Sequence, residues 1–325
     1  MRYREFGRTG MEVSAIGTGT WAISGVRWGP TDDRESVRGI QRAVDLGVTL
    51  FDTVDVFGDG RSEELLGDAL RGRRHGVRII TKGGINFYRR PHEQDFTPSY
   101  LDRALGESLR RLRTDYIDVY MLHSPTAYAL AESDLYDFLE RLQGQGRLLA
   151  YGASVATVED ATRAIATGRF SCLEVPYNIL DQDMATEVLP QAQQAGMAVV
   201  ARAPLALGML TGKLTRDTQF HRQDVRSGWD RDEYLRRLEK VERLRWLVHD
   251  DVRSLTEAAL AFTLSHPAIT AAVPGFRTTD QIDEHARAAD LFPLPQEDLD
   301  ELADMYEDDF GFGLPHHVED PWKDL

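Results

Sequence analysis

The feature that most constrains the fold is a repeated alternation of short, β-rich apolar runs with amphipathic helical stretches. Eight runs are candidate strands: residues 14–17, 49–52, 77–81, 117–122, 148–153, 172–175, 198–201 and 269–273. The candidate helices are residues 33–46, 62–70, 98–112, 135–145, 158–167, 184–195, 255–265 and 279–289. Strands that alternate with helices pair in parallel, and eight such units predict a closed α/β barrel of the (β/α)8 TIM type. A hairpin over about residues 3–12 precedes it.

A doubly wound open sheet is the alternative topology. It is disfavoured because no G-x-G-x-x-G motif follows the first strand. Two long connections, residues 86–96 and 205–229, follow the third and seventh strands, where barrels usually carry binding groups. The tail after Pro295 begins as an acidic helix-like run and then either covers the barrel mouth or ends loosely.

Composition narrows the class of protein. The 325 residues suffice for one barrel domain over residues 1–325, and the single cysteine, Cys172, excludes an intrachain disulfide. A net charge of −15 argues against general binding to nucleic acid or an anionic membrane, although a local basic pocket is compatible with it. Without a long apolar run or a signal-like amino terminus, we expect a cytoplasmic protein. The oligomeric state cannot be read from the sequence.

Three ionisable residues end consecutive strands: Asp52, Lys82 and His123 close the second, third and fourth. In a barrel these strand ends are neighbours, so the three side chains should converge at one mouth. A Lys–Asp pair offsets part of the cost of burying either charge. For each residue alone, a structural ion pair or a hydrogen-bonded histidine is the simpler explanation. All three together favour an active site.

The residues around these positions resemble the aldo-keto reductase family. Residues 51–67 (FDTVDVFGDGRSEELLG) are similar to its first signature and residues 115–125 (DYIDVYMLHSP) to its second. Residues 79–82 (IITK) match its lysine strand, and residues 204–213 (PLALGMLTGK) match the loop after strand seven. The opening 7–10 (GRTG) with Trp21 also fits, and the resemblance covers about residues 1–310.

The resemblance implies a barrel enzyme that interconverts carbonyls and alcohols with a nicotinamide cofactor, usually NADP(H), and without a metal. In the family a tyrosine is the general acid, a lysine paired with an aspartate tunes it, and a histidine orients the substrate. Asp52, Lys82 and His123 match three of these positions. The tyrosine position holds Phe57, which has no proton to donate. A substitute acid is therefore needed, and His123 is the first candidate, with Tyr88 as a second.

The resemblance also implies a cofactor site. Ser154 is kept where the carboxamide is held, Glu174 replaces a glutamine there, and Tyr177 matches the aromatic that stacks on the nicotinamide. Arg277 and the start of the last helix match the seat of the NADP 2′-phosphate. The full set of cofactor-binding candidates is Thr20, Trp21, Asp52, Ser154, Glu174, Tyr177, Pro204, Leu205, Gly208, Leu210, Lys213, Gly275, Arg277, Gln281, Glu284 and His285.

Three functions remain open. The first is an NADP(H)-dependent oxidoreductase that acts on a small carbonyl or alcohol and uses a substitute acid. The second is a non-redox enzyme on the same barrel, such as a dehydratase, lyase or epimerase. The third is a catalytically impaired relative that still binds NADP. The sequence does not identify the substrate.

Overall fold

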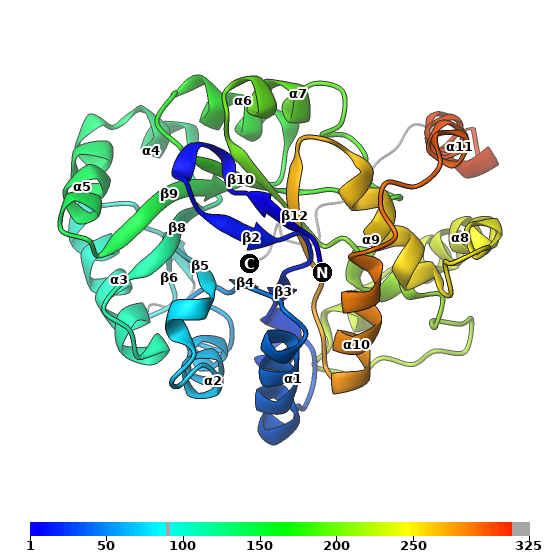
Figure 1. Ribbon diagram of the computed structural model, residues 1–325, viewed down its shortest axis with the longest axis horizontal. Helices are drawn as coiled ribbons and strands as arrows, with labels where there is room; N and C mark the ends of the chain where they lie inside the picture. The colour runs from blue at the N-terminus through cyan, green and yellow to red at the C-terminus, as the bar shows by residue number, and fades with distance from the viewer. Residues whose placement is uncertain (89–91, 314–325) are drawn as a thin grey trace.

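The computed structural model describes residues 1–88 and 92–313. Eight parallel strands form one sheet in the order β12-β11-β10-β9-β8-β5-β4-β3. Bridges from Ile16 to Ala272 and from Gly19 to Gly275 bring its two edges together, which gives a nearly closed barrel (Figure 1). The predicted (β/α)8 architecture is confirmed. The strands are β3 (Thr18–Gly19), β4 (Leu50–Asp52), β5 (Arg78–Gly83), β8 (Ile117–His123), β9 (Leu148–Ser154), β10 (Cys172–Pro176), β11 (Ala198–Arg202) and β12 (Ile269–Val273).

Helices surround the strands as an outer layer (Figure 1). Their starts follow from local sequence: Asp32 caps α1 by accepting from two backbone N–H groups, and Thr97 with Pro98 begins α3. The helices are α1 (Asp33–Asp45), α2 (Arg61–Ala69), α3 (Pro98–Leu112), α4 (Ala127–Ala131), α5 (Ser133–Gly144), α6 (Val158–Ala166), α7 (Val188–Gln194), α8 (Arg231–Glu242), α9 (Leu255–Ser265), α10 (Thr279–Ala288) and α11 (Gln296–Glu307). In the described chain no helix has the length and apolar character to span a membrane.

The amino-terminal hairpin closes one end of the barrel. Strands β1 (Tyr3–Glu5) and β2 (Glu12–Ser14) pair antiparallel, and the buried side chains of Phe6 and Val13 pack on residues inside the barrel such as Val200. The backbone of Gly7 approaches that of Ala198, where β11 begins, so the closed end is the amino end of the strands. The functional cavity must therefore open at their carboxyl ends.

The first barrel strand is displaced from its predicted position at 14–17. Ser14 instead pairs with Tyr3 in the hairpin, and the barrel strand is β3, four residues later. The Ser14 hydroxyl accepts from the backbone N–H of Thr49, which fixes the hairpin beside the start of β4. Helix α7 also begins later than predicted, at Val188, because turns occupy the preceding residues.

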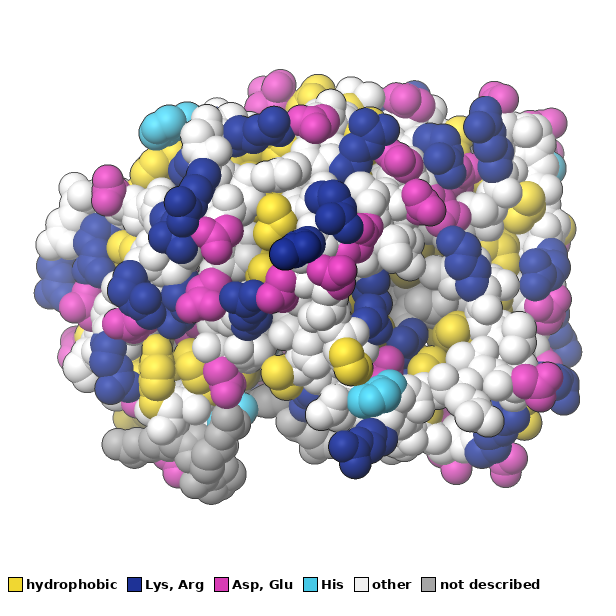
Figure 2. Space-filling view, turned by 90° about the horizontal axis from the view of Figure 1, so that it is seen from below, with side chains coloured by type: hydrophobic (Ala, Val, Ile, Leu, Met, Phe, Trp, Pro, Cys, Tyr) yellow, Lys and Arg dark blue, Asp and Glu magenta, His cyan; other side chains and the backbone are white. Residues whose placement is uncertain are grey.

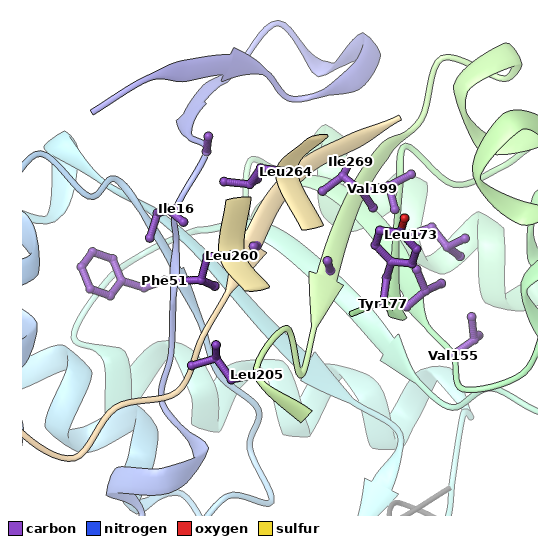
Figure 3. Packing of buried hydrophobic residues seen from close by; sticks show 14 of the residues in the cluster. Ile16, Phe51, Val155, Leu173, Tyr177, Val199, Leu205, Leu260, Leu264 and Ile269 are labelled. Atoms are coloured by element: carbon purple, nitrogen blue, oxygen red, sulfur yellow. The ribbon is translucent and has the colours of Figure 1, made fainter. Parts of the chain in front are cut away.

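Apolar side chains between the strands and the helices form the main core. Phe51 on β4, Leu173 on β10 and Val199 on β11 are fully buried, and Leu260 on α9 packs in the same cluster (Figure 3). Each fully buried aliphatic or aromatic side chain of this size contributes about 1.5–3 kcal/mol relative to exposure. This core fixes the strand ends on which the polar site residues stand.

Both long connections contain local structure. The first holds a small hairpin, β6 (Ile85–Asn86) with β7 (Glu93–Gln94), and the second holds short 3₁₀ turns and leads into α8. The described part of the tail forms α11 and then packs beside α8, where Asp309 pairs with Arg236 and Lys240. Residues 314–325 lie outside the described chain.

Candidate active site

A cavity of about 290 Å³ lies at the carboxyl ends of the strands, and its lining extends from Lys82 on β5 to His285 on α10. Its described lining is more basic than the protein as a whole. Five cationic side chains contribute, Lys82, Arg202, Lys213, Arg226 and Arg277, against three carboxylates, Asp52, Glu174 and Glu284. Basic and acidic side chains are interspersed over the face in Figure 2, so the positive bias of the cavity is local. It suits an anionic ligand such as a dinucleotide.

Lys82 lies between two carboxyl groups at the floor of this cavity. Its Nζ hydrogen-bonds Asp52 Oδ1, donates to the backbone oxygen of Thr53 at 3.1 Å, and lies 3.1 Å from Glu174 Oε2. Ser154 holds the other carboxyl oxygen of Glu174 by donating to it at 3.0 Å. The ammonium therefore donates to two acceptors and forms an ion pair with Glu174, whose Oε2 has no hydrogen-bond partner among the described residues. Strands β4, β5, β9 and β10 supply these residues.

The charges of this group do not balance, because one ammonium faces two carboxyl groups. Burial, the charge of Glu174 and a hydrogen bond from Glu174 raise the pKa of Asp52 to about 8, although Lys82 opposes the rise. Burial opposes the charge on Lys82, but the two carboxylates outweigh it and raise the lysine pKa. Two carboxyl groups this close cannot easily both ionise. The pair therefore retains one proton at neutral pH.

His123 ends β8 beside this group. Burial, aided by the charges of Lys82 and Arg202, lowers the imidazole pKa to about 3. The ring is therefore neutral at physiological pH, which argues against the protonated imidazole expected as the substitute acid. A neutral imidazole still offers one N–H donor, so His123 can orient a carbonyl oxygen.

Phe57 forms part of an apolar wall of the cavity. Its ring stacks on Trp21 with the centroids 5.5 Å apart, and Trp21 meets Trp28 edge-on at 5.1 Å. All three side chains are buried and line the cavity. The hydroxyl-bearing alternative, Tyr88, is 48% exposed, stacks on Phe87 and is not part of the described lining.

The other end of the cavity is the start of α10, where the sequence predicts a phosphate seat. The Arg277 guanidinium lines the cavity but donates to the backbone oxygen of Trp28 at 2.8 Å and also to that of Pro30. The backbone N–H groups expected to be free are already used. Gln281 accepts from two of them, and Glu35 accepts from Thr279 at 2.8 Å. A phosphate seat here therefore rests on the side chain of Arg277 rather than on the helix amides.

The loop after β11 is tied to other segments by one ion pair and one cation–π contact. Lys213 contacts Glu284 of α10 at 2.8 Å. Arg226 pairs with Asp224 at 2.8 Å, donates to the backbone oxygen of Leu207 at 3.2 Å and covers the ring of Trp28 at 4.7 Å. These contacts join segments far apart in the sequence into one wall.

Most predicted site residues line the cavity, including the four catalytic candidates Asp52, Phe57, Lys82 and His123. The cofactor candidates that do so are Thr20, Trp21, Asp52, Ser154, Glu174, Pro204, Leu205, Gly208, Lys213, Gly275, Arg277, Gln281, Glu284 and His285. Two candidates are placed elsewhere. Leu210 is buried in the core, and Tyr177 stacks on Phe262 of α9 at 5.5 Å.

The position of Tyr177 follows from the two-residue period of a strand. It lies an even number of residues from Leu173 and Val175, and all three side chains belong to the main core, whereas Glu174 lines the cavity. Figure 3 shows Leu173 and Tyr177 near one another in this core. The same period on β11 turns Arg202 into the cavity with Val200 inside the barrel. Sequence reasoning missed Arg202, although alternation along the strand was a sufficient signal for it.

Comparison with known proteins agrees with this geometry. Residues 15–307 match the model of the aldo/keto reductase family. The chain belongs to this family. It is 31% identical over 291 residues to the aldo-keto reductase YhdN of Bacillus subtilis, with 87% of each chain covered.

Two solved aldo-keto reductases have the same fold. The holo form of AKR11C1 from Bacillus halodurans superposes with a TM-score of 0.80 at 27% identity, covering 94% of this chain and 96% of that one. The glycerol dehydrogenase AKR11B4 from Gluconobacter oxydans superposes with a TM-score of 0.81 at 26% identity, covering 95% of each chain.

Aldo-keto reductases are oxidoreductases that bind nicotinamide cofactors, and the cavity fits such a group. The lining combines apolar walls with cationic side chains from β11, the loop after it and the turn before α10. At the far end the buried Nδ1 of His285 has no hydrogen-bond partner among the described residues and lines the cavity. In the described chain no three His, Cys, Asp or Glu side chains are grouped to hold a metal ion.

Proposed function

We propose that this protein is an NADP(H)-dependent oxidoreductase that interconverts a small carbonyl compound and its alcohol. The observation that carries the proposal is the single cavity that joins the Asp52–Lys82 pair and His123 to the cationic end at Arg277. A small hydroxylated substrate agrees with the activity named for the glycerol dehydrogenase AKR11B4 from Gluconobacter oxydans.

Each residue of the site has a separate task. A bound reduced nicotinamide supplies the hydride that the carbonyl carbon accepts. His123 donates one N–H to the carbonyl oxygen, and Lys82 holds the charge at the cavity floor. Trp21 and Phe57 exclude water, which strengthens both polar interactions.

The preference for NADP(H) rests on Arg277. A guanidinium binds phosphate oxygens in a bidentate manner, and this one lines the end of the cavity nearest α10. Glu35 opposes the preference, since its carboxylate lies on the N–H of Thr279 beside that end. Arg277 is therefore assigned to bind the 2′-phosphate, and its attraction for the phosphate must exceed the repulsion from the Glu35 carboxylate.

The test is turnover of the purified protein with NADPH and a panel of small aldehydes, ketones and hydroxyketones. We expect NADPH consumption that is stoichiometric with the alcohol formed. A product formed without net NADPH oxidation would instead support the non-redox enzyme. Tight NADPH binding without turnover on any member would support the catalytically impaired relative.

A further inference from the structure

The missing tyrosine and the Glu174 substitution concern the same lysine. Phe57 offers Lys82 no hydroxyl, and Glu174 supplies an oxygen 3.1 Å from its Nζ. Ser154 and Lys82 fix the carboxyl group from both sides, so Glu174 is held within the cavity rather than free to turn. The two departures from the family pattern, Phe57 and Glu174, therefore both change the groups that are available to Lys82.

The other side chains near this point are poor proton donors. Lys82 donates to Asp52 and to the Thr53 backbone oxygen, and the positive charge of its ammonium is paired with Glu174. His123 faces the cations Lys82 and Arg202, which oppose its protonation. Among the described residues, no tyrosine or cysteine lines the cavity. The carboxyl pair of Asp52 and Glu174 is the remaining source of a proton.

We propose that Glu174 is the general acid of this site, donating the proton that it shares with Asp52 to the carbonyl oxygen. The inference rests on the proposed function. In reduction the carboxyl O–H bond breaks and an O–H bond forms on the substrate oxygen, while the carbonyl carbon takes the hydride from the reduced nicotinamide. The carbonyl is reduced and the nicotinamide oxidised, and one proton from solvent restores the pair. Oxidation of the alcohol reverses each step.

The charged and titratable groups around Glu174 come from every neighbouring strand. They are Asp52 on β4, Lys82 on β5, His123 on β8, Cys172 on β10 itself and Arg202 on β11. The nearby cations lower the free energy of the state in which both Asp52 and Glu174 are ionised. Burial opposes the loss of the last proton from these two carboxyl groups. We therefore expect kcat for reduction to fall as pH rises through the titration of the pair.

Glu174→Gln tests the inference, because glutamine keeps the shape of the side chain and the contact with Ser154 but cannot donate an acid proton. We expect kcat to fall by about 10²–10⁴-fold, the usual contribution of a positioned acid. Glu174→Asp, which keeps the carboxyl group, should retain part of the activity. The double variant Phe57→Tyr with Glu174→Gln restores a tyrosine and a glutamine together and should recover turnover.

A second readout does not depend on activity. Infrared difference spectra of the cofactor-free protein at pH 7 should show one protonated carboxyl group in the wild type that Glu174→Gln lacks. Buried carboxyl groups elsewhere, among them Asp55, whose pKa burial raises well above its usual value, are present in both proteins and cancel. NADPH titration shows that the variant still has a folded site.

The outcomes separate the two proposals. If the wild type reduces carbonyls and Glu174→Gln keeps kcat within about threefold, the acid role of Glu174 is wrong while the proposed function stands. An absent infrared difference would also contradict it. If the wild type binds NADPH but reduces no carbonyl, the proposed function fails and the acid role with it.

Discussion

At the scale of single residues, the cofactor end of the cavity depends on two side chains of opposite charge. Arg277 lines the cavity, and its guanidinium donates to the backbone oxygens of Trp28 and Pro30. Glu35 reaches the first turn of α10 from α1 and accepts from the Thr279 backbone. One favours a 2′-phosphate and the other repels it, so each can be tested separately.

Arg277→Ala should raise the Kd for NADPH by about 10- to 150-fold, the effect of losing a charge-assisted hydrogen bond of about 1.5–3 kcal/mol. The Kd for NADH should change by less than about threefold. Fluorescence titration with both cofactors measures this. An equal loss for NADPH and NADH would show that Arg277 acts only by holding Trp28 and Pro30.

Glu35→Gln should tighten NADPH binding and leave NADH binding unchanged. The amide can still accept from Thr279, so the main change is the lost negative charge beside the phosphate seat. The measurement is the ratio of the Kd for NADH to the Kd for NADPH, compared between the variant and the wild type. A ratio equal to that of the wild type would place the phosphate beyond the influence of Glu35.

At the scale of elements, the position of the site depends on how closely helices pack around the strand ends. Gly67 on α2 lets α3 approach, and a Cβ there would lie 2.5 Å from the backbone oxygen of Arg111. Gly106 on α3 has no such role, since its nearest neighbour would be the Arg147 guanidinium at 3.9 Å. The two glycines therefore make a matched pair.

Gly67→Ala should destabilise the protein by about 1–3 kcal/mol, because backbone cannot move aside for the added methyl group. Gly106→Ala should stabilise it by about 0.5–1 kcal/mol, because alanine restricts the unfolded chain and favours the helix. Denaturant midpoints at unchanged slope measure both effects. Equal shifts for the two variants would contradict the close packing of α2 on α3.

The elements themselves were largely predictable from sequence, since strand and helix periodicities differ and caps such as Asp32 and Thr97 mark helix starts. The meeting of Asp52, Lys82 and His123 followed from barrel geometry alone. The ion pair between Lys82 and Glu174 did not, because it joins non-adjacent strands through side chains whose reach no periodicity describes. The error at Tyr177 came from carrying over a family role without checking the parity of β10.

At the scale of the whole molecule, buried histidines link stability to pH. Burial and the charge of Lys213 lower the pKa of His285 to about 4, although Glu284 opposes this. His285 is therefore neutral in the folded protein at pH 5 but protonated in the unfolded chain, where its pKa is about 6.5. Its contribution to stability is complete above about pH 6.5 and is lost as pH falls towards 4.

His285→Asn should reduce the loss of stability between pH 7.5 and pH 5 by about 2 kcal/mol, since about 1.4 kcal/mol is lost per pH unit for each such group. Denaturation at the two pH values measures the difference between the variant and the wild type. His123 remains in both proteins, and its share of the acid sensitivity should persist. A variant that loses as much stability as the wild type would contradict the neutral, buried state of His285.

The most direct test of the account is a fluorescence titration of the purified protein with NADPH, with NADH as the comparison. We expect saturable binding of both cofactors with NADPH preferred, because one cavity joins the Lys82 floor to the Arg277 end. Binding of neither cofactor would contradict the oxidoreductase function. The carboxyl–lysine group at the cavity floor would then have to serve chemistry without a nicotinamide.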